Sequence, residues 1–242
     1  MSPRILSLTL QDKSGTRSGD VTITQAVVAG WTGRDPAAVE KHIRELEALG
    51  VKRPATTPIF YRVSALRLTT ATEIEVVGPR SGGEVEFVLL QHGGRTWVGA
   101  GSDHTDREVE TYRVTVSKQM CDKPLAPVFW AFDDVAPHWD RLMLRAYVIE
   151  NGARKIYQEG SVAAMLKPLD LIGRCALGAG TPTAAVPDGR ARLPENTLMF
   201  CGTHAVRGGI RPADRFDFEL EDPVLGRTIR HGYAVQTLPV LG

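Results

Sequence analysis

The sequence of 242 residues predicts a mixed α+β fold that is rich in β-strands. Between Pro54 and Val116, short runs of alternating apolar and polar residues are separated by glycine and proline, which is typical of strands joined by turns. Only residues 36–49 and 161–176 carry a helical pattern. The composition, 43% hydrophobic and 24% charged, is that of an ordinary globular protein, and we expect one domain over residues 1–242.

The N-terminal strands are expected within residues 1–25. Residues 4–10 and 21–24 alternate as short strands do, and the polar residues 11–20 between them are interpreted as a turn. A helix over residues 36–49 should follow, because Asp35 is a good N-cap, Pro36 suits the first helical position and Gly50 suits the stop.

This helix has an apolar stripe that includes Val39 and Ile43. At about 100° per residue, His42 falls inside the stripe and Glu45 lies at its edge, one turn away. We therefore expect His42 to face protein. A core histidine with an incidental glutamate is the simple structural interpretation of this pair.

The second helical region, residues 161–176, should be interrupted or restarted at Pro168. Residues 178–195, rich in glycine, proline and alanine, predict a long inserted loop, which often serves as a functional cover. Strands are expected again over residues 198–206 and 215–235.

Three carboxylates are predicted to meet on one face of one sheet. A strand starting at Glu84 points Glu84 and Glu86 to the same side. If Gly93 and Gly94 form the centre of a hairpin turn, Asp103 on the returning strand lies opposite Glu84. Like charges on facing positions are unfavourable unless a cation compensates them, which indicates a divalent metal site.

Two simpler interpretations compete with the metal site. Glutamates in alternation on a strand most often form a solvated face. A second pair, Glu73 and Glu75, has the same spacing. The hairpin that returns directly to Asp103 favours the pair at Glu84 and Glu86.

Charge and cysteine usage exclude several classes of function. The net charge is +1 and the basic residues are spread along the chain, so we expect neither a nucleic-acid partner nor binding to a membrane surface. Cys121, Cys175 and Cys201 are isolated, which argues against disulfides and zinc and favours buried thiols in a reducing compartment. No stretch suits a signal peptide or a spanning helix, and a cytoplasmic protein with a small-molecule substrate is expected.

Several motifs occur in an order that resembles the fumarylacetoacetase-like hydrolase family. They are Val28-Ala29-Gly30-Trp31, His42-Ile43-Arg44-Glu45, Pro58 to Arg62, Glu84-Val85-Glu86, Asp103 to Glu108, Lys118, Asn151-Gly152 with Gln158, Gly202-Thr203 and Pro212-Ala213-Asp214. The sequence departs from the family pattern at Arg62, Asp106 and His204, where lysine, alanine and proline are usual, so it resembles a divergent branch.

The resemblance implies a β-sandwich roll with a few peripheral helices, a single catalytic domain and a homodimer. It implies roles for eight residues. These are Glu84, Glu86 and Asp103 as ligands of Mg²⁺ (or Mn²⁺), His42, Glu45 and Lys118 as catalytic residues, and Arg107 and Thr203 as substrate contacts.

The activity implied is hydrolysis of a C–C bond in a small acylpyruvate-like or β-diketo carboxylic acid through a metal-stabilised enolate, with His42 drawing a proton from water. A hydratase, isomerase or decarboxylase of a 2-oxo acid could use the same metal site. A metabolite-binding protein without turnover is the alternative outside enzymes. A surface position for Lys118, an ion pair with a core acid for Arg107 and a backbone turn for Thr203 are the corresponding structural interpretations.

Overall fold

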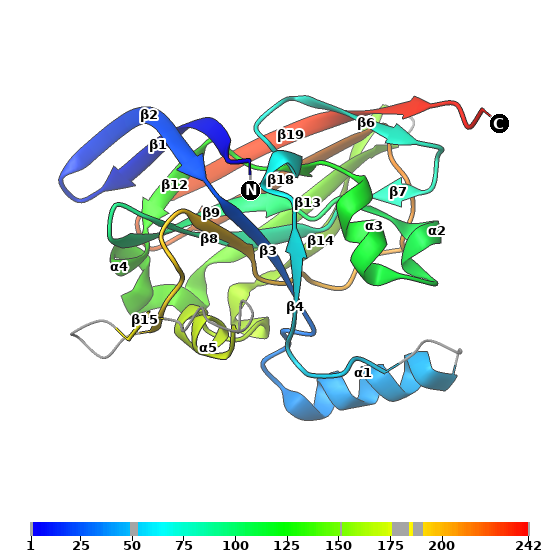
Figure 1. The fold of residues 1–242 in the computed structure, drawn as a ribbon, viewed down its shortest axis with the longest axis horizontal. Helices are drawn as coiled ribbons and strands as arrows, with labels where there is room; N and C mark the ends of the chain where they lie inside the picture. The colour runs from blue at the N-terminus through cyan, green and yellow to red at the C-terminus, as the bar shows by residue number, and fades with distance from the viewer. Residues whose placement is uncertain (1, 49–52, 151, 176–183, 186–190, 242) are drawn as a thin grey trace.

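A computed structural model of the chain describes residues 2–48, 53–150, 152–175, 184–185 and 191–241 (Figure 1). Its largest element is an eight-stranded sheet with the order β2-β1-β12-β9-β8-β17-β3-β4. The strands are β1 (Arg4–Asp12), β2 (Gly15–Ile23), β3 (Gln25–Gly30), β4 (Ile59–Val63), β8 (Val85–His92), β9 (Arg95–Ser102), β12 (Val128–Ala131) and β17 (Thr197–Phe200).

A second sheet of five strands has the order β14-β13-β18-β19-β6. Its strands are β6 (Glu73–Val77), β13 (Met143–Glu150), β14 (Ala153–Ser161), β18 (Arg215–Asp222) and β19 (Arg227–Leu238). Short two-stranded pairs complete the β-structure: β5 (Leu68–Thr69) with β11 (Lys123–Pro124), β7 (Ser81–Gly82) with β10 (Thr105–Asp106), and β15 (Ala184–Ala185) with β16 (Ala191–Arg192).

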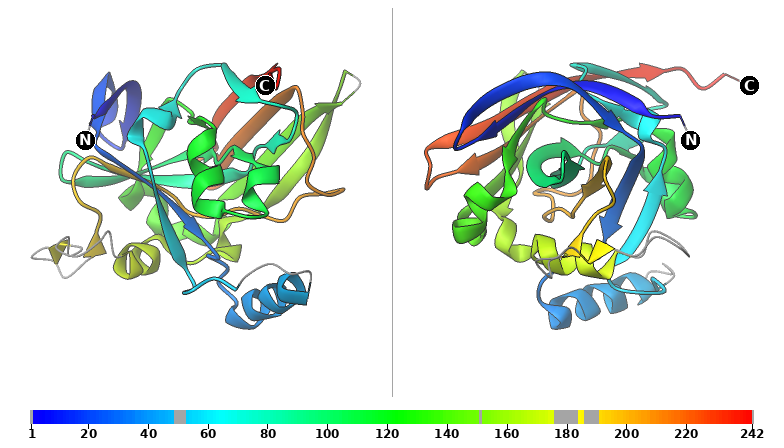
Figure 2. Two further views of the ribbon diagram at one scale, coloured as in Figure 1. Left: turned by 45° about the vertical axis from the view of Figure 1, so that its right-hand side comes forward. Right: turned by 60° about the vertical axis from the view of Figure 1, so that its left-hand side comes forward.

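The helices of the described residues are short and lie at the periphery, and none of them is long and apolar enough to cross a membrane. They are α1 (Pro36–Ala48), α2 (Arg107–Glu110), α3 (Val114–Met120), α4 (Phe132–Val135) and α5 (Pro168–Arg174), with the 3₁₀ turns η1 (Ala65–Arg67), η2 (Ala136–Arg141) and η3 (Val162–Ala164). Figure 2 shows α1 at the edge of the molecule, joined to the body through β3 and β4.

Strand β8 is buried on both faces. Phe87 and Leu89 pack into the core shared with the five-stranded sheet, whereas Val88 and Leu90 pack into a second core formed with β1, β2 and β12. This double burial explains the unbroken apolar run in the sequence. Glu86 belongs to the same face as Val88 and Leu90.

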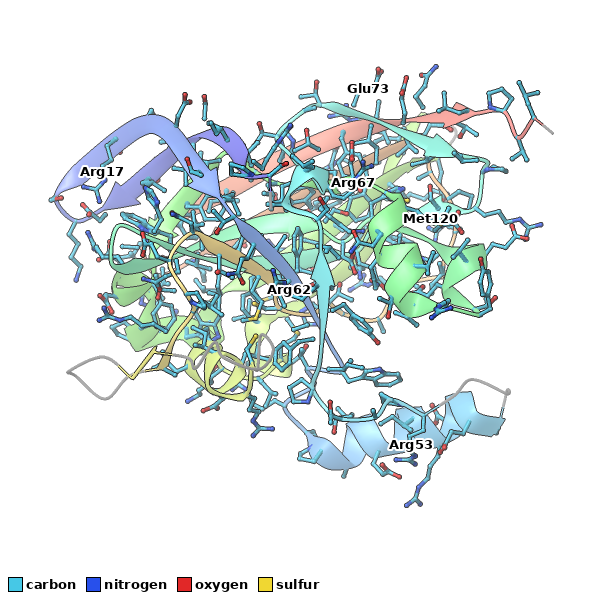
Figure 3. The ribbon with its side chains drawn as sticks, viewed as in Figure 1. Arg17, Arg53, Arg62, Arg67, Glu73 and Met120 are labelled. Atoms are coloured by element: carbon cyan, nitrogen blue, oxygen red, sulfur yellow. The ribbon has the colours of Figure 1, made fainter. Side chains whose placement is uncertain are left out.

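The predicted hairpin is confirmed. Val85 pairs with Ser102 and Glu86 with Gly101, and the turn residues Gly93 and Gly94 have φ of +61° and +72°. The competing pair lies on β6, where Glu73 and Glu75 are exposed and the intervening Ile74 is buried. Figure 3 shows Glu73 pointing away from the body, so this pair is a solvated face.

The N-terminus corrects one prediction. The turn predicted over residues 11–20 is confined to residues 13–14, because β1 and β2 pair from Arg4–Ile23 to Asp12–Gly15. Polar side chains stabilise this exposed hairpin, because Ser7 donates to Asp20 at 2.6 Å and the hydroxyls of Thr9 and Ser18 lie 2.9 Å apart. Residues 15–20 of β2 are exposed on both faces of the strand, so their sequence shows no apolar alternation.

The helix predictions are confirmed in outline. Asp35 caps α1 by accepting from the Ala37 amide at 2.9 Å. The region 161–176 splits into η3 and α5, and Pro168 is the first residue of α5 because its missing N–H is tolerated there. Most of the predicted loop 178–195 lies outside the described residues, which there include β15, β16 and residues 193–195.

At the C-terminal end, β18 and β19 confirm the strands expected over residues 215–235. The strand expected over 198–206 is wrong beyond Phe200. Gly202 has φ of +102°, which turns the chain out of the sheet and carries Thr203 away from the ladder.

Close packing around Gly101 generates a stability prediction. A Cβ there would lie 2.7 Å from Phe200, 2.8 Å from Leu125 and 3.0 Å from the Pro124 carbonyl oxygen. We expect Gly101→Ala to lower the free energy of unfolding by about 1–3 kcal/mol, measured by urea denaturation. Gly19→Ala is the control, since a Cβ at Gly19 meets nothing within 4 Å. Equal stabilities of the two variants would contradict the packing argument.

Candidate metal and substrate site

The hairpin brings the three predicted acids together. Glu84 immediately precedes β8, Glu86 lies within it and Asp103 follows β9. The Asp103 amide donates to the Glu84 carbonyl oxygen at 3.0 Å, which extends the ladder by one step. One carboxylate oxygen from each acid can be chosen so that all lie within 4.8 Å of one another.

Asp103 is buried between two lysines. Lys118 Nζ lies 2.6 Å from Asp103 Oδ2, and Lys123 Nζ lies 3.0 Å from Oδ1. Burial opposes ionisation of Asp103, but the two ammonium groups outweigh it and lower the pKa of this carboxyl well below its usual range. Besides the ion pair with Lys118, no partner of the buried Oδ2 is found among the described residues, and a carboxylate oxygen has a second lone pair for a further ligand.

Glu86 has the opposite environment. It is 3% exposed, and its Oε2 accepts a short hydrogen bond from the Gly202 amide. Burial, together with the nearby charge of Asp103, raises the pKa of Glu86 well above its usual value, and neither the Gly202 amide nor Lys118 reverses this. Glu86 is thus a carboxyl that needs a cation or a proton.

Arg107, Glu110 and Lys118 form a charged layer beside the acids. Arg107 Nη1 lies 2.7 Å from Glu110 Oε2 and 3.3 Å from Glu84 Oε1. Lys118 Nζ lies 3.2 Å from Glu110 Oε1 and 3.8 Å from Glu84 Oε2. The surface position considered for Lys118 is wrong, because its side chain is 8% exposed.

Gln158 on β14 holds the loop that carries Thr203. Its Oε1 accepts from the Val85 amide at 2.9 Å, and its Nε2 donates to Thr203 Oγ1 at 2.7 Å and to the His204 carbonyl oxygen at 2.6 Å. Thr203 Oγ1 in turn donates to the Val85 carbonyl oxygen at 2.6 Å. The hydroxyl of Thr203 therefore has a structural role, and its contact with substrate stays a prediction.

The acids lie in a cavity of about 1240 Å³. Its polar lining includes Glu84, Glu86, Asp103, Arg107, Glu110, Lys118 and Thr203, and its apolar lining includes Val28, Ala38, Val39, Val114, Ala164 and Ile210. Every predicted metal ligand and both predicted substrate contacts thus face one space. Such a cavity is large enough for a small organic acid.

Of the predicted dyad, the structure describes only the side chain of Glu45, which does not line the cavity. Glu45 is exposed and lies 3.9 Å from Lys41 on the surface of α1. Among the described residues of α1, the cavity lining extends as far as Val39. His42 lies on α1, but its side chain is outside the described residues, so the prediction that it faces protein stays a prediction.

Sequence reasoning missed three residues of the site. Glu110 and Tyr61 line the cavity, and Lys123 is fully buried beneath Asp103. The spacing of three between Arg107 and Glu110 on α2 could have indicated Glu110. Nothing local indicates Lys123, because it reaches Asp103 through the parallel pairing of β11 with β5.

Two departures from the family pattern have structural explanations. Asp106 is the N-cap of α2, and its Oδ1 accepts from the amides of Glu108 and Val109 at 3.0 and 2.9 Å. The His204 ring packs against Gly160, where a Cβ would come within 2.5 Å of it.

The cysteines are buried free thiols, as predicted. Burial raises the pKa of Cys121 and of Cys175 to about 11, and that of Cys201 well above its usual value. Thiols protonated to this degree are poor nucleophiles.

The donors present suit a hard divalent cation. Glu84, Glu86 and Asp103 offer carboxylate oxygens, which Mg²⁺ and Mn²⁺ prefer. The second lone pair of Asp103 Oδ2 and the raised pKa of Glu86 both fit an ion at this position. The three acids could therefore hold a metal.

A β-rich fumarylacetoacetase-like fold with a cavity built around three carboxylates is the class that the structure defines, and the predicted fold class is confirmed. The chain belongs to the family described as "Protein of unknown function (DUF2848)", which it matches over residues 29–233. No curated protein matches the sequence.

Solved structures share this fold at low sequence identity. A crystal structure of Cg1458 has a TM-score of 0.61 and 14% identity, covering 93% of this chain and 81% of that one. A structure of 2-keto-3-deoxy-D-arabinonate dehydratase complexed with magnesium and 2,5-dioxopentanoate has a TM-score of 0.57 and 16% identity, covering 93% and 78%.

The environment of Glu86 predicts a pH-dependent stability. Because its pKa is raised in the folded state, the folded protein retains a proton that the unfolded chain loses above the ordinary pKa of 4.5. This carboxyl should therefore lower the free energy of unfolding of the metal-free protein as the pH rises above 4.5. In chelator, Glu86→Gln should be more stable than wild type at pH 8, with a difference that shrinks toward pH 4.5.

Added Mg²⁺ should reverse the order of stability. The wild type should gain about 2.7 kcal/mol at a Mg²⁺ concentration one hundred times its Kd, and Glu86→Gln should gain little. Thermal denaturation measures both effects, and Glu75→Gln, on the exposed face of β6, is the control. A wild type and a Glu86→Gln variant with the same pH profile would contradict this account.

Proposed function

We propose that the chain is an enzyme that acts on a small 2-oxo acid with a bound divalent metal, Mg²⁺ or Mn²⁺, and that it is a divergent member of the fumarylacetoacetase-like family. The observation that carries the proposal is the convergence of Glu84, Glu86 and Asp103 within 4.8 Å in a cavity of about 1240 Å³. Residues 1–242 would form one catalytic domain.

The structural relatives support this choice of substrate class. The dehydratase of the same fold was solved with magnesium and with 2,5-dioxopentanoate, which is itself a 2-oxo acid. Its 16% identity carries the fold, so the chemistry must be argued from the residues of this chain.

The side chains have distinct proposed roles. Glu84, Glu86 and Asp103 would hold the metal, which when bound supplies a Lewis acid for the enolate of a 2-oxo acid. Lys118 keeps Asp103 ionised and lines the cavity. Arg107 fixes Glu84 by an ion pair at 3.3 Å and, as proposed from the sequence, contacts substrate.

Hydrolysis of a C–C bond in an acylpyruvate-like or β-diketo acid is the first proposed reaction. It assigns proton transfer from water to His42, oriented by Glu45. Both residues lie on α1, whose N-cap Asp35 borders the cavity together with Ala38 and Val39 of the first turns.

A reaction without water activation by the dyad is the second candidate, as in a hydratase, isomerase or decarboxylase. The position of Glu45 favours it, since this carboxylate is exposed and paired with Lys41 at 3.9 Å. In this case the acids and the charged layer around Lys118 suffice to bind the substrate and stabilise its charge.

A turnover screen separates these reactions. With 2-oxo and β-diketo acids and Mg²⁺, Glu86→Ala should abolish turnover, because a ligand is lost. If hydrolysis by the dyad is correct, His42→Ala should lower kcat by about 10²- to 10⁴-fold. Arg44→Ala is the control and should behave as wild type, since Arg44 is exposed on the same helix and pairs with Glu40.

Two results would change the proposal. Unaltered turnover in His42→Ala, together with an inactive Glu86→Ala, would rule out hydrolysis by the dyad and favour the second candidate. If calorimetry detects no binding of Mg²⁺ or Mn²⁺ at millimolar concentration, both enzyme proposals fail and a metabolite-binding protein without turnover is favoured.

A further inference from the structure

The cavity is lined by more acids than cations. Among the described residues its carboxylates are Asp35, Glu84, Glu86, Asp103 and Glu110, and its cations are Arg34, Arg107 and Lys118. Each of these cations already has carboxylate partners. Arg34 binds Asp140 through two hydrogen bonds of 2.9 and 2.8 Å and donates its Nε to the Met165 carbonyl oxygen.

Glu110 pairs with Arg107 and Lys118, the two cavity-lining cations that also contact the predicted metal ligands. Its Oε2 accepts from Arg107 at 2.7 Å, and its Oε1 lies 3.2 Å from Lys118. Arg107 Nη2 is also used, since it donates to the Gly82 carbonyl oxygen at 3.2 Å. Lys118 has Asp103 and Thr105 as further partners at 2.6 and 3.3 Å. An arriving anion would have to displace Glu110 from one of these cations.

The net charge of the ionisable residues around the metal site limits the charge of the substrate that can bind there. Burial raises the pKa of Glu110, but Lys118 and Arg107 outweigh this and lower it, so Glu110 is ionised at neutral pH. Four carboxylates then face three cations: Glu84, Glu86, Asp103 and Glu110 against Arg107, Lys118 and Lys123. With a divalent ion bound and Glu86 ionised, the net charge of this cluster is +1, which one monoanion neutralises.

We propose that Glu110 makes this site selective for 2-oxo acids with one carboxylate and an uncharged remainder. A second carboxylate would meet Glu110 and, among the described lining residues, only cations already paired with carboxylates, whereas an uncharged chain can lie against Val39, Val114 and Ile210. This inference rests on the proposed function, since it assumes that a 2-oxo acid binds at the metal site. To that function it adds the net charge of the substrate and names Glu110 as the residue that selects for this charge.

Calorimetry with two matched acids tests the proposal. In the presence of Mg²⁺, 2-oxopentanoate and 2-oxopentanedioate differ only in the distal carboxylate. The wild type should bind 2-oxopentanoate at least about tenfold more tightly. Glu110→Gln should change the ratio of the two Kd values by about tenfold or more in favour of 2-oxopentanedioate. The substitution frees Lys118 and Arg107 for the distal carboxylate while it keeps the size of the side chain.

Two further variants separate charge from structure. Glu110→Asp keeps the charge and should keep the wild-type ratio. Glu108→Gln is the matched control on the same helix, since Glu108 is exposed and lies 3.7 Å from Arg80. The ratio of the two Kd values is the readout, and it is insensitive to a uniform loss of affinity in a destabilised variant.

Each failure has its own signature. A wild type that binds both acids equally well, or a Glu110→Gln variant with an unchanged ratio, overturns the role of Glu110 and leaves the proposed function intact. Binding of neither acid by the wild type with Mg²⁺ overturns the proposed function and, with it, this inference.

Discussion

The site depends on how a buried carboxylate at the end of β9 is kept charged. Asp103 is 1% exposed, and an ionised carboxylate in such surroundings is unstable without close cations. Lys118 reaches it from α3, which packs on β10, and Lys123 reaches it from β11, which pairs with β5. The short elements α3 and β11 therefore position the two ammonium groups that compensate the charge of Asp103.

Gln158 ties the two sheets together at this point. It belongs to β14 in the five-stranded sheet, yet its amide group bonds to both Val85 and the loop of Thr203 and His204. The same loop presents the Gly202 amide to Glu86. The fully buried amide group of Gln158 thus fixes the backbone at Val85, which lies between Glu84 and Glu86. It also fixes the loop whose Gly202 amide donates to Glu86. The site therefore lies where the two sheets meet.

Local signals in the sequence were sufficient for some of these features. Two glycines set the turn, the turn set the register, and the register placed Asp103 opposite Glu84; likewise Asp35 marked the start of α1. Features that depend on distant pairing were not predictable. Lys123 has no local pattern because β11 exists only beside β5, and the strand at residues 15–20 has no buried face to impose alternation. Glu110 had a local partner in Arg107, but its contact with Lys118 requires the packing of α2 on α3.

The acids are compensated unequally, and this inequality indicates how the site works. Asp103 has two ammonium groups and is held ionised, whereas Glu86, on the neighbouring strand, has a backbone amide as its one direct donor in the described part of the chain and a raised pKa. A proton and a divalent cation are then alternative ways to neutralise Glu86, so metal binding should release a proton. The lysines preserve the shape of the site in either state, because their partner Asp103 does not change its charge. A site arranged in this way is organised before the metal arrives, and only the protonation of Glu86 has to change on binding.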